Sequence, residues 1–240
     1  MTAASPVSRG GQPAAGQGAA EAGSMESLYP FLYAGRTDEA AVLEQVRQST
    51  AAKAREILEL RQAVLDRDGA RLMACASEMA ARFAGGGRLL AFGNGGSATD
   101  AQQIATLFLH PGGELRPLPA LSLASDNSVI TALSNDVGVD VVFARQIGAF
   151  GRKNDIAVGL STSGNSENLL RAFDEAARRG MLTIGIAGYR GGKMAELDTI
   201  DYLFVAPSAS VHRIQEAQTT VYHAVWELTL ALLGREQVTG

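Results

Sequence analysis

The 240-residue sequence contains one cysteine, one tryptophan, three histidines and no long apolar run. Because Cys75 has no partner in the chain, no intrachain disulfide can form, which fits a reducing cytoplasm. Cys75 lies in a helical pattern, so we expect a small buried hydrophobic residue there, with a reactive thiol as the alternative. No apolar segment approaches the roughly 20 residues that span a bilayer, and we therefore expect no membrane contact.

An excess of charge of one sign is also missing. The formal net charge is −4, and charged residues make up 19% of the chain. Electrostatic capture of nucleic acid or of an anionic membrane needs a basic surplus, so neither is expected as a partner. Apolar residues make up 46% of the chain, which at this length is enough for a sizeable core. The composition therefore predicts a globular protein.

Residues 1–24 have almost nothing that could be buried, being rich in Ala, Gly, Pro, Ser and Gln. Such a segment cannot offset the entropy lost on ordering, so we expect a disordered tail and a single domain over residues 25–240. The tail lacks the continuous apolar segment of a secretory signal. We therefore expect a cytoplasmic protein.

Hydrophobic periodicity divides the domain into a helical start and an alternating remainder. Apolar residues at helical spacing predict one helix over 37–66 and a second over 68–83, a pair that ends at three glycines, 85–87. Five short apolar runs follow, most of them separated by enough chain for a helix, and a last helix is expected over 211–233. The runs are RLLAFG (88–93), ALSLAS (120–125), IAVGLS (156–161), LTIGIAG (182–188) and YLFVA (202–206). This alternation predicts an α/β fold with a five-stranded parallel sheet flanked by helices.

Two of the predicted strands run through a polar turn into a helix. The first turn is GNGGSA (93–98), and the second is STSGNS (161–166). Ligands of open parallel sheets bind outside the carboxyl ends of the strands, near the point where the strand order reverses. We therefore expect these two turns to form the walls of one binding site.

The second turn, which we call the serine loop, favours a phosphate. Its helix start offers free backbone amides and the positive end of a dipole, and Gly164 allows close approach. The loop has no lysine or arginine, so a small phosphorylated metabolite suits it better than a nucleoside triphosphate. The alternative is that Asn165 or Ser166 only caps the helix. The predicted hydroxyl donors are Ser161, Thr162, Ser163 and Ser166.

The first turn satisfies the dinucleotide pattern G-x-G-x-x-G/A, which requires an acidic residue about 20 positions later. Asp126 comes more than 30 positions after Gly93, so a nicotinamide cofactor is a minority interpretation. We interpret Asn94 and Ser97 as donors to the ligand of the serine loop, with helix capping as the alternative for Ser97. Asp126, which follows the 120–125 run, is a further candidate substrate-binding residue.

Six motifs follow one another within about residues 40–235: GNGGSATDAQ, RPLPALSL, ALSNDVG, GLSTSGNSENLLRA, GGKMAEL and RIQEAQ. Together they resemble the SIS (sugar isomerase) domain proteins of the phosphoheptose isomerase type. The resemblance implies a phosphosugar site without a nucleotide, an isomerase acting on sedoheptulose 7-phosphate, and a homotetramer with sites between subunits.

Compared position by position, the resemblance breaks at the metal site of that family. The family has a His and a Glu, four residues apart, on the helix after the first turn, where this sequence has Gln103 and Leu107. The family's other two ligands, a Gln and a His on the last helix, correspond to Gln215 and His223. A Gln and a His without a carboxylate are a poor zinc site, so we expect no metal and no cofactor.

The same glutamate is the proton-transfer base of the family, and Leu107 cannot take a proton. Aldose–ketose interconversion moves a proton between C1 and C2, so another residue has to carry it. We therefore interpret His223 as the catalytic proton carrier and Gln215 as the residue that orients the sugar oxygens.

The histidines have simpler alternatives. His223 is either catalytic or a core histidine beside Tyr222 and Trp226. His212 corresponds to a site aspartate of the family and is a candidate substrate-binding residue, or only an exposed residue in the first turn of its helix. We therefore expect a phosphosugar isomerase. The alternative is a non-catalytic module that senses a phosphosugar or binds a protein partner.

Overall fold

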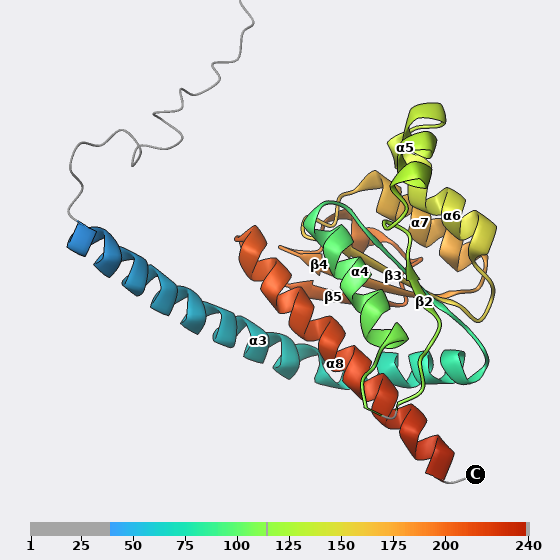
Figure 1. Ribbon diagram of the computed structural model, residues 1–240, viewed down its shortest axis with the longest axis horizontal. Helices are drawn as coiled ribbons and strands as arrows, with labels where there is room; N and C mark the ends of the chain where they lie inside the picture. The colour runs from blue at the N-terminus through green and yellow to red at the C-terminus, as the bar shows by residue number, and fades with distance from the viewer. Residues whose placement is uncertain (1–38, 114, 239–240) are drawn as a thin grey trace, which may run out of the picture. The chain divides into compact units, whose positions relative to one another are not determined.

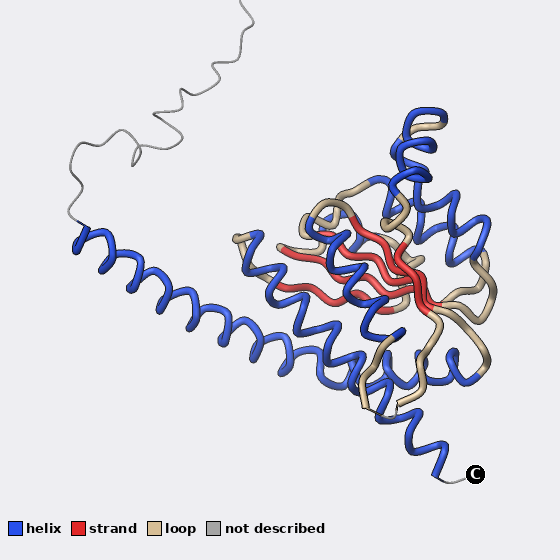
Figure 2. The backbone as a smooth tube through the Cα atoms, viewed as in Figure 1, coloured by secondary structure: helices blue, strands red, loops and turns tan. Residues whose placement is uncertain are grey.

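A five-stranded parallel sheet organises the computed structural model of the protein, which describes residues 39–113 and 115–238 (Figures 1 and 2). The strand order is β2-β1-β3-β4-β5, and every pairing is parallel, which confirms the predicted fold class. The second strand is shorter than the 120–125 run because only three residues pair with β1. The strands are β1 (Leu89–Gly93), β2 (Ala120–Ser122), β3 (Ile156–Ser161), β4 (Leu182–Gly188) and β5 (Tyr202–Ala206).

Helices cover both faces of this sheet. Side chains of α3, α4 and α8 form one core cluster with one face of the sheet, and side chains of α6 and α7 form another with the opposite face. All of these core residues belong to the compact unit of residues 51–240. The helices are α3 (Glu39–Ala84), α4 (Gly96–Leu109), α5 (Asn127–Asp136), α6 (Val142–Phe150), α7 (Glu167–Arg178) and α8 (Val211–Val238), with 3-10 turns η1 (Val139–Val141) and η2 (Gly192–Glu196).

Burial on both faces explains why the strands are continuous apolar runs. Every residue of β1, β3 and β4 is buried, so no position could be polar and face water. Aromatic rings fill both layers. Phe92 lies 5.3 Å from Phe173 on one side of the sheet, and Phe83 lies 5.2 Å from Phe108 on the other, measured between ring centroids.

The expected pair of N-terminal helices is wrong, because residues 39–84 form the single helix α3. Asp68 and Gly69 suggested a break. The carboxylate of Asp68 is buried and pairs with Arg67 and Arg71 of the same helix, so it does not act as a cap. Gly69 alone costs a helix only about 1 kcal/mol relative to alanine, and no proline interrupts the segment.

Other expectations fare differently. The last helix starts at Val211 as predicted and continues to Val238. Cys75 is fully buried, and this burial raises the pKa of its thiol far above the ordinary value, so the reactive alternative is not supported. The predicted tail over residues 1–24, and the domain start at residue 25, lie outside the described residues. Within the described part of the chain, no helix is long and apolar enough to cross a bilayer.

Candidate functional site

The two predicted turns meet at the point where the strand order reverses. The chain passes from β1 outward to β2 and then returns to β3 on the other side of β1. The turns after β1 and β3 are therefore neighbours, and a reciprocal amide pair joins them. Asn94 Nδ2 donates to Asn168 Oδ1 at 2.9 Å, and Asn168 Nδ2 donates to Asn94 Oδ1 at 3.0 Å. Each amide keeps one further donor and acceptor position for a ligand.

Hydroxyl groups converge within the serine loop. Ser161 Oγ lies 3.5 Å from the Oγ atoms of both Ser163 and Ser166. It also accepts a hydrogen bond from the backbone N–H of Gly164 at 3.0 Å, which closes the turn. Thr162 is half-buried, and its hydroxyl has no partner among the described residues. Three of the four predicted hydroxyl donors thus share one small volume.

Two features show why the serine loop has this shape. Gly164 has φ +67°, and a Cβ placed there would lie 1.9 Å from the carbonyl oxygen of Gly191. Only glycine fits, because the turn after β4 packs directly on the loop. From that turn, the N–H of Lys193 donates to Asn165 Oδ1 at 3.0 Å, and the N–H of Met194 donates to the Gly164 carbonyl.

The first amides of α7 remain available. Ser166 is the N-cap residue in extended conformation, but its side chain makes no capping hydrogen bond, and the Asn165 side chain is bonded elsewhere. The backbone N–H groups of Ser166, Glu167 and Asn168 have no acceptor within the described residues. The capping alternative is therefore not what the structure contains. Free amides at a helix start, beside hydroxyls, are a typical anion site.

Below the serine loop, a buried amide that sequence reasoning missed supports the strand ends. Gln218 of α8 is completely buried, and its Nε2 lies 3.1 Å from the carbonyl oxygen of Ile186 and 3.4 Å from that of Ser161. It therefore links the last residue of β3 to β4. Gln218 Oε1 has no hydrogen-bond partner within the described residues. A glutamine inside an amphipathic helix gave no signal for this role.

Helix α8 also approaches the first turn. A Cβ placed on Gly96 would lie 2.2 Å from Gln215 Nε2, so the side chain of Gln215 reaches the start of α4. Ser97 in the first turn of α4 is buried, and neither it nor Gly95 caps the helix through a side chain. Gln215, Ser97 and the Asn94 amide thus gather at one end of α4.

Helices α4 and α8 continue side by side from this point, along what we call the α4–α8 seam (Asp100, Leu107, Gln215, Tyr222 and Trp226). Tyr222 OH lies 3.5 Å from Asp100 Oδ1, and Trp226 Nε1 donates to the Leu107 carbonyl at 3.0 Å. His223 is half-buried, with its ring centroid 5.2 Å from that of Tyr222 and 6.0 Å from that of Trp226. The predicted proton carrier therefore lies against two neighbouring aromatic rings.

Asp100 is the carboxylate of the seam, and sequence reasoning did not single it out. Its Oδ2 is buried without a partner among the described residues. Burial raises the pKa of Asp100 above its ordinary value, and the hydrogen bond from Tyr222 partly opposes this rise. Burial also raises the pKa of Tyr222. Asp100 is seven residues before Leu107, so both lie on the same face of α4.

The positions that correspond to the family's metal ligands do not fit a zinc ion. Gln103 is exposed, and Leu107 packs against the core. Across residues 39–113 and 115–238, no group of three or more His, Cys, Asp or Glu side chains is close enough to hold a metal ion. Gln215 and His223 remain as neutral donors without a carboxylate, which is too weak a set for tight zinc binding.

Two predicted substrate-binding residues have other surroundings. Asp126 is the N-cap of α5, and its Oδ1 accepts hydrogen bonds from the N–H groups of Ser128 and Val129. His212 is exposed in the first turn of α8. Within the described part of the chain, no hydrogen bond or ion pair joins either of them to the serine loop, so their binding roles stay predictions.

Comparison with known proteins identifies the family of the chain. Residues 54–188 match the SIS domain family. The chain is 41% identical over 179 residues to the phosphoheptose isomerase of Pelodictyon phaeoclathratiforme, an alignment that covers 73% of this chain and 84% of that protein. It is 46% identical over 160 residues to the phosphoheptose isomerase of Burkholderia pseudomallei, with 65% and 80% covered.

Solved structures show the same architecture. The phosphoheptose isomerase of Neisseria gonorrhoeae superposes with a TM-score of 0.68 at 36% identity, covering 76% of this chain and 97% of that one. The phosphoheptose isomerase of Francisella tularensis superposes with a TM-score of 0.70 at 29% identity, covering 79% and 98%. The chain therefore belongs to the SIS domain family, alongside the phosphoheptose isomerases.

Proposed function

We propose that the protein is a phosphosugar isomerase that interconverts the aldose and ketose forms of a sugar phosphate, with sedoheptulose 7-phosphate as the first candidate substrate. The serine loop carries this proposal, because its hydroxyls and free amides converge at the switch point of the sheet. The relatives named phosphoheptose isomerase support the same activity. They also favour an enzyme over the non-catalytic sensing or interaction module.

In this proposal the serine loop holds the phosphate. A phosphomonoester dianion accepts hydrogen bonds from the first N–H groups of α7, and the dipole of that helix adds to the attraction. Asn94 and Ser97 contact the ligand from the first turn. The hydroxyls that complete the cradle are those of Ser161, Thr162, Ser163 and Ser166. Because the donors are neutral, affinity depends on their geometry more than on long-range charge.

The sugar then extends toward the α4–α8 seam, where His223 carries the proton. The base removes the proton from the carbon next to the carbonyl, and the electron pair forms the double bond of an enediol. The proton returns to the other carbon, and the hydroxyl proton passes from the neighbouring oxygen to the former carbonyl oxygen, so atoms and charge balance without a further reactant. Gln215 is assigned to the sugar oxygens, because its amide reaches the start of α4, where Asn94 and Ser97 also lie.

The assembly and location of the protein are also proposals. The resemblance to phosphoheptose isomerases suggests a homotetramer with sites between subunits. In such an assembly, a neighbouring subunit would supply acid–base side chains that Leu107 cannot provide. A cytoplasmic location is proposed because a chain with one cysteine forms no intrachain disulfide. A protein partner other than a second copy stays an alternative.

The test is a turnover assay with purified protein and a panel of aldose and ketose phosphates, followed with His223→Ala. We expect turnover of a heptose phosphate, and a loss of kcat of at least about 100-fold in the variant, as for removal of a general base. His110→Ala is the matched control, because His110 is exposed at the end of α4 and has no assigned role.

The same protein is examined by thermal shift. A ligand at 100 times its Kd stabilises a protein by about 2.7 kcal/mol whether or not it reacts. Stabilisation without turnover would overturn the isomerase and leave a sensor. The absence of both stabilisation and turnover would overturn the phosphosugar site itself. Turnover that is equal in the parent and in His223→Ala would remove His223 from the mechanism.

A further inference from the structure

One side of α4 faces α8 along the α4–α8 seam (Figure 1). Gly96, Asp100, Gln103 and Leu107 recur on that side at helical spacing. Gly96, Asp100 and Leu107 approach residues of α8 directly. Gln103 and Leu107 are the two positions that correspond to the His and the Glu of the family's metal site. Both positions therefore lie toward the helix that carries the family's other two ligand positions.

Neither of these two side chains suits a divalent metal ion. Gln103 is exposed and uncharged, and Leu107 has no lone pair to donate. Leu107 packs against the hydrophobic core, as Trp226 of α8 does, and Trp226 Nε1 donates to the Leu107 carbonyl at 3.0 Å. Position 107 therefore contributes to the packing of α4 and α8, where a metal site would need a charged ligand.

The two corresponding residues of α8 lie in separate places. Gln215 and His223 are eight residues apart, which is about 12 Å along the helix axis at roughly 1.5 Å per residue. The Gln215 amide lies beside Gly96 at the start of α4, whereas the His223 ring lies against the rings of Tyr222 and Trp226. Zinc ligand atoms lie about 2.0–2.3 Å from the ion, so these two groups do not converge on one ion within the chain.

The carboxylates of this region do not complete a metal site either. Asp100 Oδ2 is enclosed by protein, and Asp100 Oδ1 faces the Tyr222 hydroxyl at 3.5 Å. Glu227 is exposed four residues after His223, so this face of α8 offers at most a pair of ligands. In the part of the chain that the structure describes, no three His, Cys, Asp or Glu side chains come close enough to hold an ion. Catalytic zinc sites use about three protein ligands, so a pair is too few.

We propose that this chain binds no catalytic divalent metal ion and that its isomerase activity is independent of one. Gln103 and Leu107 carry the inference, because the donors that remain around them are too few and too far apart. The statement about metal binding stands on these side chains alone. The statement about activity rests on the proposed function.

The proposal assigns the stabilisation of developing charge to hydrogen-bond donors. Removal of a proton by His223 leaves negative charge on a sugar oxygen of the enediol, and without a cation this charge is stabilised by preorganised N–H groups. Gln215 is the assigned donor, because its amide lies at the start of α4 with Asn94 and Ser97. A chelator cannot remove such a donor.

The first test is titration calorimetry of the untagged full chain with zinc chloride. We expect no binding by the parent at micromolar protein. Gln103→His together with Leu107→Glu returns an imidazole and a carboxylate to the seam, so this variant should bind zinc at least about 100-fold more tightly than the parent. Tight binding of zinc by the parent would overturn the inference. If the double variant fails to fold, the titration of the parent still decides.

The matched control is Gln102→His together with Thr106→Glu. It creates the same pair at the same spacing, but on a different and exposed side of α4. We expect it to bind zinc at least about tenfold more weakly than Gln103→His with Leu107→Glu, because it gains no ligand from α8. Equal affinity of the two double variants would overturn the assignment of the lost site to Gln103 and Leu107.

The second test is turnover of sedoheptulose 7-phosphate after dialysis against EDTA, and again after zinc is added back. We expect kcat to change by less than about twofold in both conditions, whereas removal of a catalytic metal ion costs far more. A loss on chelation that zinc restores would overturn the inference and leave the isomerase standing. No turnover of any sugar phosphate in either condition would overturn the proposed function, and the zinc titration would still test the metal inference.

Discussion

The serine loop and the α4–α8 seam differ in how the chain holds their polar groups. In the loop, the hydroxyls of Ser161 and Ser163 accept hydrogen bonds from backbone N–H groups of the same loop. The turn after β4 donates two more hydrogen bonds to the loop. In the seam, Asp100 Oδ2 has no partner within the described residues, and its Tyr222 contact is long at 3.5 Å.

This difference fits the two proposed roles, phosphate binding in the loop and proton transfer at the seam. Hydrogen bonds within one chain fix the shape of the proposed phosphate cradle, while its free amides stay available to a ligand. A site that is already shaped loses less entropy on binding. In the seam, where the proposed proton transfer occurs, the carboxylate oxygen Asp100 Oδ2 is buried without a partner among the described residues. A buried polar atom without a partner is costly, so the seam carries a stability cost at Asp100.

The largest expected effect comes from breaking the cradle with Gly164→Ala. The new Cβ would lie 1.9 Å from the Gly191 oxygen, at a backbone φ that disfavours alanine. We therefore expect the free energy of unfolding to fall by about 3 kcal/mol or more. The melting temperature should fall by roughly 6–12 °C, and binding of a sugar phosphate should be lost. Gly86→Ala is the control, because Gly86 has φ +79° but nothing within 4 Å. A variant no worse than that control would contradict the tight fit of the loop.

A smaller effect is expected from removing the support below the loop. Gln218→Leu leaves the carbonyls of Ser161 and Ile186 without their side-chain donor, which should cost about 2 kcal/mol. Phosphate affinity should fall with stability, because the end of β3 carries the first hydroxyl of the cradle. Denaturant unfolding measures the loss, and Gln102→Leu on the exposed face of α4 serves as the comparison, within about 0.5 kcal/mol of the parent.

The link between the two turns is tested by a double-mutant cycle. Asn94→Leu, Asn168→Leu and the double variant should give a coupling energy of about 1–2 kcal/mol, since the two amides donate to each other. Equilibrium unfolding in urea measures it. Additive single effects would show that the amide pair does not hold the turns together, and the rigid cradle would then rest on Gly164 and Gln218 alone.

The sequence predicted those parts of the site that are local. The serine loop runs from strand to turn to helix within a few residues, so hydroxyl density, glycine and helix start could be read together. The sheet followed for a similar reason, since doubly buried strands are continuous apolar runs. Its edge strand was overestimated, because β2 pairs over three residues only.

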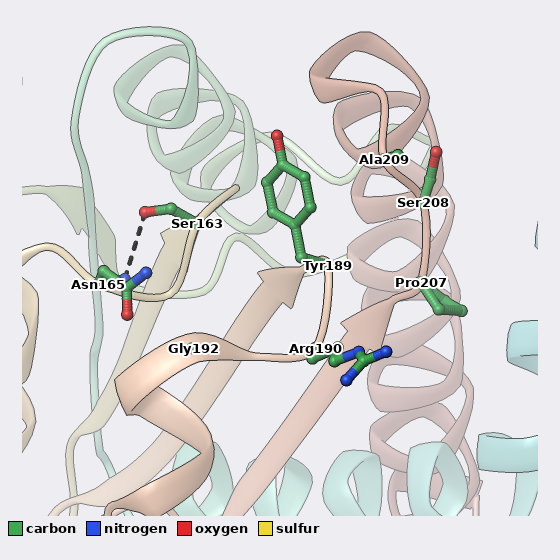
Figure 3. A pocket seen from close by; sticks show the side chains of 8 residues that line it. All are labelled: Ser163, Asn165, Tyr189, Arg190, Gly192, Pro207, Ser208 and Ala209. Atoms are coloured by element: carbon green, nitrogen blue, oxygen red, sulfur yellow. Dashed lines mark hydrogen bonds between the residues drawn. The ribbon is translucent and has the colours of Figure 1, made fainter.

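The parts that sequence reasoning missed are contacts between distant segments. Asn168 looked like an ordinary residue in the first turn of α7, and its partner Asn94 is 74 positions away. Asp68 followed by Gly69 is a pattern typical of a helix boundary. The sequence does not show that Asp68 is buried and paired with arginines inside one continuous helix. A hollow lined by Ser163, Tyr189, Arg190 and Ser208 forms where three distant segments meet (Figure 3). No periodicity in the sequence predicts that these segments lie together.

The smallest expected effect, and the one that sharpens the view of the seam, is the pH dependence of Asp100. Burial raises its folded-state pKa above the unfolded value near 3.8. The protonated form therefore favours the folded protein. That contribution to stability is fully present below the unfolded pKa, and it is lost as the pH rises through the folded pKa. Asp100→Asn stays neutral, so its stability relative to the parent should grow as the pH rises from about 4 to 7.

Melting temperatures across this pH range measure the difference, with Asp198→Asn as the control for an exposed carboxylate. Tyr222→Phe adds a second readout. The Tyr222 hydrogen bond lowers the pKa of Asp100, so its removal should move the rise in relative stability to higher pH. A difference that does not change with pH would mean that Asp100 is solvated or paired in solution. The contrast between the internally bonded loop and the seam would then disappear, because the Asp100 carboxylate would already have a partner or water around it.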